Sequence, residues 1–163
     1  MKIAVVSDTH DNVRAISTFC LEVQIRGVDL ILHAGDVISP FAARALLKPS
    51  IPIRCVFGNN DGEREGLRAI FLNAGEIVTP PLKFEMGGRI YFMVHDILPF
   101  HRDLETLKPD VVISGHTHEV DVKHGGKRLY INPGEACGWL SGRHTFVLFD
   151  TEKNMTEIIE MEV

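Results

Sequence analysis

Two histidines, His116 and His118, follow a glycine and the apolar run Val111-Val112-Ile113 in the stretch VVISGHTH. The run predicts a buried strand, and side chains two residues apart point the same way in an extended chain. Both imidazoles can therefore converge on one point beyond the strand, as they do in metal sites. The alternative is a polar loop that happens to contain two histidines, because an H-x-H pattern is a weak motif by itself.

Aspartate, asparagine and histidine also follow four other apolar runs that predict strands. These positions are Asp8-Thr9-His10, Gly35-Asp36, Gly58-Asn59-Asn60-Asp61 and His95. In open α/β sheets, ligands bind beyond the carboxyl ends of the strands. Five strand ends with the same kind of residue favour one shared site over coincidence.

The residue types at these ends indicate more than one metal ion. Seven candidate donors are Asp8, His10, Asp36, Asn59, His95, His116 and His118. A single tetrahedral zinc needs three or four ligands, and no set of cysteines suggests a structural zinc. Seven mixed nitrogen and oxygen donors suit two divalent transition metals that share one carboxylate. We therefore expect His116 and His118 to bind two different, adjacent ions.

The elements that position these residues follow from periodicity and from turn signals. The first half predicts strands at 2–7, 29–34 and 53–57, which alternate with helices at 12–26, 40–47 and 63–73, the last ending near Gly75. The second half predicts the hairpins 82–86/89–94, 120–124/127–131 and 145–150/155–161, a strand at 111–113 and a short helix at 103–107. Alternating strands and helices predict parallel pairing. We expect two sheets packed face to face with helices outside, in a single domain over residues 1–163.

Composition limits the class of protein. Hydrophobic residues make up 45% and charged residues 24% of the chain, as in ordinary globular proteins, and the net charge is −5. That charge argues against a nucleic-acid platform, but it permits phosphate substrates because bound cations can reverse the local sign. The scattered Cys20, Cys55 and Cys137 indicate a reducing compartment. Without an apolar run of ~20 residues or a signal peptide, we expect a cytoplasmic protein with no membrane partner.

The ordered blocks SDTHDN, HAGDV, FGNND, SGHTH and INPG resemble the calcineurin-like metallophosphoesterases, and among them most closely the small YfcE/MJ0936-type phosphodiesterases. Each block is weak alone, but five in order cover nearly the whole chain. The resemblance implies a four-layer αββα sandwich. It also implies that one ion is bound by Asp8, His10 and His118, the other by Asn59, His95 and His116, with Asp36 as the bridge.

The resemblance further implies a metal-dependent phosphodiesterase in which metal-activated hydroxide attacks the phosphorus of a small phosphodiester. Asp8, His10, Asp36 and Asn59 would form the hydroxide site. The cofactors would be two divalent transition-metal ions, with manganese first and nickel, cobalt, iron or zinc as the other candidates. Assembly into a homo-oligomer is left open.

Two positions depart from the wider family pattern. Asn60 stands where many relatives have a histidine that helps the leaving group, and an amide cannot readily donate and recover a proton. Asp96 replaces a glycine after His95. We therefore assign Asn60 to hydrogen bonding with a substrate oxygen and name no general acid. Asn132, in the INPG block, is a second candidate for substrate binding.

Other functions fit the same fold. One alternative is a non-catalytic metal-binding scaffold, like the retromer subunit that shares this fold, although all seven ligand positions are retained here. The others are a phosphomonoesterase, which needs more positive charge, and a nuclease, which needs a basic groove.

Overall fold

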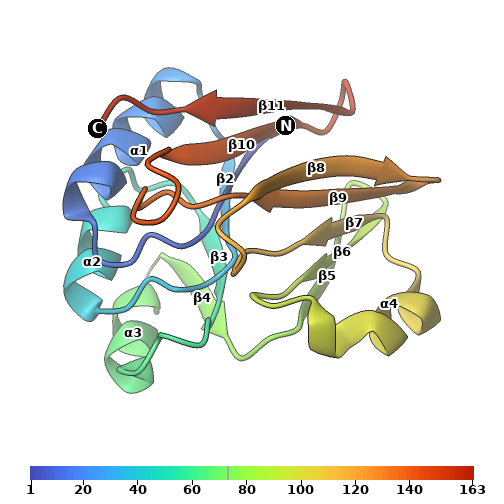
Figure 1. The fold of residues 1–163 in the computed structure, drawn as a ribbon, viewed down its shortest axis with the longest axis horizontal. Coiled ribbons are helices and arrows are strands. Elements are labelled where there is room, and N and C mark those ends of the chain that lie inside the picture. The colour runs from blue at the N-terminus through green and yellow to red at the C-terminus, as the bar shows by residue number, and fades with distance from the viewer. Residues whose placement is uncertain (73) are drawn as a thin grey trace.

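The computed structural model describes residues 1–72 and 74–163 as two β-sheets packed face to face, with helices on their outer faces (Figure 1). The strand order is β11-β10-β1-β2-β3-β4 in the first sheet and β5-β6-β7-β9-β8 in the second. Helices α1, α2 and α3 lie along the first sheet, and α4 lies beside the second. The predicted αββα arrangement of two mixed sheets is confirmed.

The first sheet is parallel in its centre and antiparallel at one edge. Its strands are β1 (Lys2–Val6), β2 (Leu30–His33), β3 (Ile53–Val56), β4 (Gly75–Val78), β10 (Thr145–Asp150) and β11 (Met155–Glu160). Strands β1 to β4 pair in parallel, whereas β10 pairs antiparallel with both β1 and β11. The carboxyl ends of β1, β2 and β3 therefore meet at one edge of the sheet.

The second sheet combines two hairpins around one central strand. Its strands are β5 (Leu82–Met86), β6 (Arg89–Met93), β7 (Val111–Ile113), β8 (Val120–Gly125) and β9 (Arg128–Pro133). Strand β7 pairs in parallel with β6 and β9, and the two hairpins are antiparallel. The residues that follow β6 and β7 therefore leave the sheet side by side.

Two of the helices, α1 and α2, begin where the sequence supplies a capping side chain. The helices are α1 (Val13–Ile25), α2 (Pro40–Leu46), α3 (Arg64–Phe71) and α4 (His101–Leu107), with a 3₁₀ turn at Leu98–Phe100 before α4. The Asn12 side chain accepts a hydrogen bond from the Ala15 amide at the start of α1. Ser39 caps α2 in the same way, and Pro40 occupies its first position.

Alternating residues of β1 face two different hydrophobic cores. Ala4 and Val6 pack with α1, α2 and α3, whereas Ile3 and Val5 pack with Tyr91 and other residues of the second sheet. A third, smaller core lies between the second sheet and α4. Because all four β1 residues are fully buried, the strand end that leads to Asp8 is held on both sides.

One strand was missing from the prediction. Gly75 was interpreted as the end of a helix, but it begins strand β4, and the predicted helix end at Asn73 lies outside the described residues. A Cβ at Gly75 would collide with the carbonyl oxygen of Ile53. The glycine is therefore needed for close approach of two strands, a use that sequence alone does not separate from a helix stop.

Candidate metal centre

The five predicted strand ends meet at one place in the structure. Backbone hydrogen bonds join their loops: the Asp8 amide donates to the Gly35 carbonyl at 3.0 Å, and the Gly115 amide donates to the His95 carbonyl at 2.9 Å. Asp8, Asp36 and His95 are buried there, whereas Asn59 and His116 are exposed. The seven residues that were predicted as metal ligands thus lie around one partly open site.

Asp36 lies between two histidines from different loops. Its Oδ2 atom is 3.4 Å from His10 Nε2 and 3.3 Å from His95 Nε2. Only 1% of its surface is exposed. A carboxylate oxygen with this placement can serve two ions, one on each side.

The remaining ligand candidates separate into two groups around Asp36. Asp8 Oδ1 is 3.5 Å from His10 Nε2 and 3.4 Å from His118 Nε2. On the other side, the rings of His95 and His116 have centroids 5.1 Å apart, and Asn59 Oδ1 is 3.1 Å from His116 Nδ1. The spacing is thus compatible with two adjacent ions.

Several ligand atoms at the centre have no hydrogen-bond partner within the described part of the chain. They are Asp8 Oδ1, His10 Nε2 and His95 Nε2, and all three are buried. An unsatisfied buried polar atom costs about 1–3 kcal/mol, so each such atom in a native protein has a reason. Asp8, His10 and His118 offer atoms within 4.8 Å of one another, and so do Asp8, Asp36 and His95. A divalent cation fits both groups and would satisfy the unpaired atoms.

The backbone of the site is held in conformations that most residues avoid. Five of the seven ligand candidates have positive φ: Asp8 (52°), His10 (39°), Asp36 (62°), His116 (71°) and His118 (61°). Such strain clusters at functional sites, where the surrounding structure over-determines the chain. Glycines make this packing possible, since a Cβ at Gly58 would collide with Asp36 Oδ1 and one at Gly115 with Ser7 Oγ.

Both central carboxylates are held in their charged form. Burial alone would raise the pKa of Asp36, but the ring of His95 3.3 Å away, together with hydrogen bonds from Asn60, lowers it well below its usual range. Burial opposes ionisation of Asp8 too, yet His10 and His95 outweigh it and lower that pKa. Two buried anions side by side favour a bound cation.

Comparison with known proteins identifies the family. The calcineurin-like phosphoesterase superfamily domain matches residues 1–154. The chain is 33% identical to the phosphodiesterase MJ0936 of Methanocaldococcus jannaschii, over 99% of this chain and 100% of that protein. This chain belongs to the calcineurin-like phosphoesterase superfamily. The predicted family is therefore confirmed.

Solved structures agree with this assignment. A novel archaeal phosphodiesterase superposes on this phosphoesterase with a TM-score of 0.91 and 32% identity, covering 98% of this chain and 99% of the other. A Vps29 mutant from Entamoeba histolytica superposes with a TM-score of 0.72, but at 18% identity, over 99% and 100% of the two chains. The second likeness shows the shared fold alone.

Asn60 contacts Asp36 in this phosphoesterase. Its side-chain amide donates to Asp36 Oδ2 at 2.7 Å, and its backbone amide donates to Asp36 Oδ1 at 2.9 Å. The residue thus orients the central carboxylate, a role that was not predicted for it. Asn132 donates to the Gly115 carbonyl at 2.9 Å and to Thr117 Oγ1 at 3.0 Å, so it supports the histidine loop. Substrate contacts by either residue stay a prediction.

Two buried carboxylates beside the site were not assigned a role from the sequence. Asp61 accepts hydrogen bonds from the amides of Gly58 at 2.7 Å and Asp36 at 3.1 Å, and so ties two ligand loops together. Glu135 Oε2 lies 2.7 Å from His118 Nδ1. The available signals were the aspartate of the FGNND block and the position of Glu135 directly after INPG.

His33, at the end of β2, is fully buried behind the site. Its Nδ1 accepts from the Gly35 amide at 3.1 Å, and Nε2 lies 3.2 Å from Thr9 Oγ1. Burial lowers the pKa of His33 to about 4, so the ring is neutral. It supports the loop that carries Asp36 and has no free nitrogen for a metal.

A cavity of about 410 Å³ opens beside His116 and Asn132. Its wall includes the carboxylates of Asp96, Glu119 and Asp121, together with Lys123, His101 and Tyr130. Lys123 pairs with Asp121, so its charge is already balanced. The space next to the site is therefore acidic.

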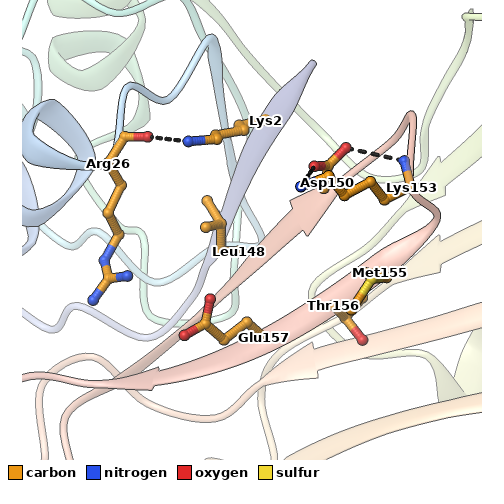
Figure 2. Close-up of a pocket in the computed structure, with 8 residues that line it drawn as sticks. All are labelled: Lys2, Arg26, Leu148, Asp150, Lys153, Met155, Thr156 and Glu157. Atoms are coloured by element: carbon orange, nitrogen blue, oxygen red, sulfur yellow. Dashed lines mark hydrogen bonds and ion pairs between the residues drawn. The ribbon is translucent and has the colours of Figure 1, made fainter.

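A second cavity, of about 320 Å³, lies near the amino end of β1, away from the metal centre (Figure 2). Lys2 Nζ donates to the Arg26 carbonyl at 2.8 Å, and the Lys153 amide donates to Asp150 Oδ1 at 3.1 Å. The groups that could bind an anion there are partly occupied by neighbours, so we assign no site to this cavity. Among the described residues, no helix is long and apolar enough to cross a membrane.

Proposed function

We propose that this phosphoesterase hydrolyses small phosphodiesters with two divalent transition-metal ions. The ions would be held by the seven predicted ligands, Asp8, His10, Asp36, Asn59, His95, His116 and His118, with Asp36 shared between them. Manganese is the first candidate, and nickel, cobalt, iron and zinc are the others. The observation that carries the proposal is the set of buried, unpartnered atoms Asp8 Oδ1, His10 Nε2 and His95 Nε2 around two ionised carboxylates.

The residues of the chain have distinct tasks in this proposal. Divalent ions in the site would neutralise phosphate oxygens and lower the pKa of the attacking water. Asn60 holds Asp36 in place through two hydrogen bonds. The exposed Asn59, Asn60 and His116 mark the open side from which a phosphate reaches the site. No residue of the chain is assigned as a general acid.

The acidic cavity favours a diester over a monoester. A phosphate monoester carries one more negative charge than a diester near neutral pH. Asp96 and Glu119 line the space beside His116, and Asp121 and Lys123 there balance each other as an ion pair, so the lining keeps a net negative charge. Like charges in a partly desolvated cleft repel, so the extra charge of a monoester is disfavoured. The relative from Methanocaldococcus jannaschii, named a phosphodiesterase, supports the same choice.

A turnover assay with defined metals tests the proposal. Metal-free protein would be prepared with a chelator, reloaded with manganese, and tested on bis-p-nitrophenyl phosphate and on p-nitrophenyl phosphate. We expect turnover that requires the metal and is faster on the diester. Fully loaded wild-type protein that hydrolyses neither ester would contradict the proposal and favour a scaffold. Faster turnover of the monoester would overturn the assignment of the substrate class.

A further inference from the structure

Glu135 is a fully buried carboxylate that accepts hydrogen bonds from the loop after it and contacts His118. Oε1 accepts from the Leu140 amide at 3.0 Å and from Ser141 Oγ at 2.7 Å. Oε2 accepts from Cys137 Sγ at 3.2 Å and lies 2.7 Å from His118 Nδ1. An ionised carboxylate only accepts hydrogen bonds, so His118 Nδ1 must carry a hydrogen.

The hydrogen on Nδ1 determines what the other ring nitrogen can do. In a neutral imidazole only one nitrogen is protonated, so Nε2 of His118 carries a lone pair. This is the nitrogen that lies 3.4 Å from Asp8 Oδ1, within the group formed with His10. On the other side of the site, His95 Nδ1 is paired with a backbone carbonyl, that of Ala34, at 2.8 Å. The two ligand groups thus differ in the acceptor that faces a histidine Nδ1, which is a carboxylate for His118 and a backbone carbonyl for His95.

We propose that Glu135 is a positioning residue that fixes the tautomer of His118 and selectively strengthens binding of the ion shared by Asp8, His10 and His118. The inference rests on the proposed function, since it needs a metal at that position. It adds a residue that no ligand motif contains, and a difference in affinity between the two ions. Partners of this kind orient the ring and raise its basicity, and their loss typically weakens metal binding about 10–100-fold.

A purely structural role for Glu135 is the competing explanation. The carboxylate also anchors the loop that carries Leu140 and Ser141. The same loop places Trp139, whose Nε1 donates to the His10 carbonyl at 3.3 Å. If anchoring were the only role, a loop variant that leaves the contact with His118 intact would disturb the site as much as a change at Glu135. Ser141→Ala is that matched control. It removes the hydrogen bond from Ser141 Oγ to Oε1 and the loop contacts of Ser141 with Arg143, but it leaves the contact between Glu135 and His118 intact.

The experiment combines zinc titration with nitrogen NMR of the imidazole rings. The proteins are wild type, Glu135→Gln, Glu135→Ala and Ser141→Ala, and the probe is the zinc ion alone. We expect zinc affinity at the group containing His118 to fall about 10-fold in Glu135→Gln, which keeps an acceptor but loses the charge, and about 100-fold in Glu135→Ala. Affinity at the group containing His95, and both affinities in Ser141→Ala, should stay within about twofold of wild type.

The metal-free spectra supply a second readout. His118 should be protonated at Nδ1 in wild type and in Ser141→Ala, and should become a mixture of tautomers in Glu135→Ala. Equal losses at both groups, or unchanged zinc affinity and tautomer in Glu135→Gln and Glu135→Ala, would overturn the inference. Glu135→Gln carries the test if Glu135→Ala does not fold. If wild type takes up no zinc, the proposed function fails, while the tautomer measurement still reports separately on Glu135.

Discussion

Replacing Asp36 by asparagine removes one negative charge at nearly constant shape, and we expect it to weaken both metal ions. The reason is the position of Oδ2, which lies 3.4 Å from His10 Nε2 and 3.3 Å from His95 Nε2. Substitution of a residue that binds only one ion would weaken the affinity for that ion alone. Asp36→Asn therefore tests whether the carboxylate is shared.

The size of the effect follows from charge and burial. At ~4 Å and an effective dielectric constant of ~20, each unit of positive charge attracts a carboxylate by about 4 kcal/mol, so this value is a lower bound for a divalent ion. Because Asp36 is only 1% exposed, water screens little of this attraction. About 1.4 kcal/mol corresponds to a tenfold change in affinity, so the full loss is nearly a thousandfold. The asparagine oxygen retains part of the binding, and we expect each ion to bind at least about 100-fold more weakly.

Isothermal titration with manganese, together with turnover of bis-p-nitrophenyl phosphate, measures both consequences. Asp103→Asn is a suitable control, because Asp103 lies on α4 with its side chain 44% exposed. Its carboxylate pairs only with Lys83 of β5, at 3.6 Å, among the described ion pairs. The control should behave as wild type. If Asp36→Asn binds either ion with normal affinity, Asp36 is not shared. Near-normal turnover in this variant would refute the two-ion assignment.

Three further outcomes are expected. Because Asn60 cannot supply a proton, hydrolysis should slow steeply as the pKa of the leaving group rises. Asn60→His should accelerate hydrolysis of alkyl diesters, by up to about 100-fold, more than hydrolysis of aryl diesters. If the rate does not change across a series of leaving groups while chemistry limits turnover, another residue donates the proton. Removing both ions with a chelator should lower the melting temperature, measured by calorimetry, by ~10–20 °C relative to protein in the metal ion at about 100 times its dissociation constant. Each bound ion adds about 2.7 kcal/mol, and two ions together add about 5.4 kcal/mol. An unchanged melting temperature would show that no ion stabilises the fold. Burial raises the pKa of Glu135, but hydrogen bonds from Ser141 and His118 outweigh this and hold the pKa at about 2, against the ordinary 4.5. Ionised Glu135 therefore stabilises the metal-free fold by about 3 kcal/mol above pH ~5, and that contribution is lost as the pH falls towards about 2. The free energies of unfolding of wild type and Glu135→Gln, measured in urea, should converge over this pH range, and a constant difference between them would contradict the prediction.

The convergence of the seven candidate ligands was predictable because strand ends are local features. Asp8 and His95 directly follow predicted strands, and Asp36 follows one after a single glycine; parallel strands bring such ends to one edge of a sheet. Periodicity gave the helices to within a few residues. The alternation of strands and helices in the first half predicted its parallel pairing, and turn signals predicted the hairpins of the second half.

The contacts that support the ligands were not predictable, because they join loops that are distant in sequence. Glu135 meets His118 across 17 positions, and Asn60 meets Asp36 across 24. A motif states which residues converge, but not which neighbouring side chain is left facing them. Strand β4 was missed for a related reason, since the use of Gly75 depends on the backbone of Ile53 in another strand.

An anomalous-difference electron density map from crystals grown with manganese tests the two-ion site most directly. We expect two peaks per chain, both adjacent to Asp36, one surrounded by Asp8, His10 and His118 and the other by Asn59, His95 and His116. A single peak at full occupancy, or peaks that do not share Asp36, would contradict the proposed dinuclear centre.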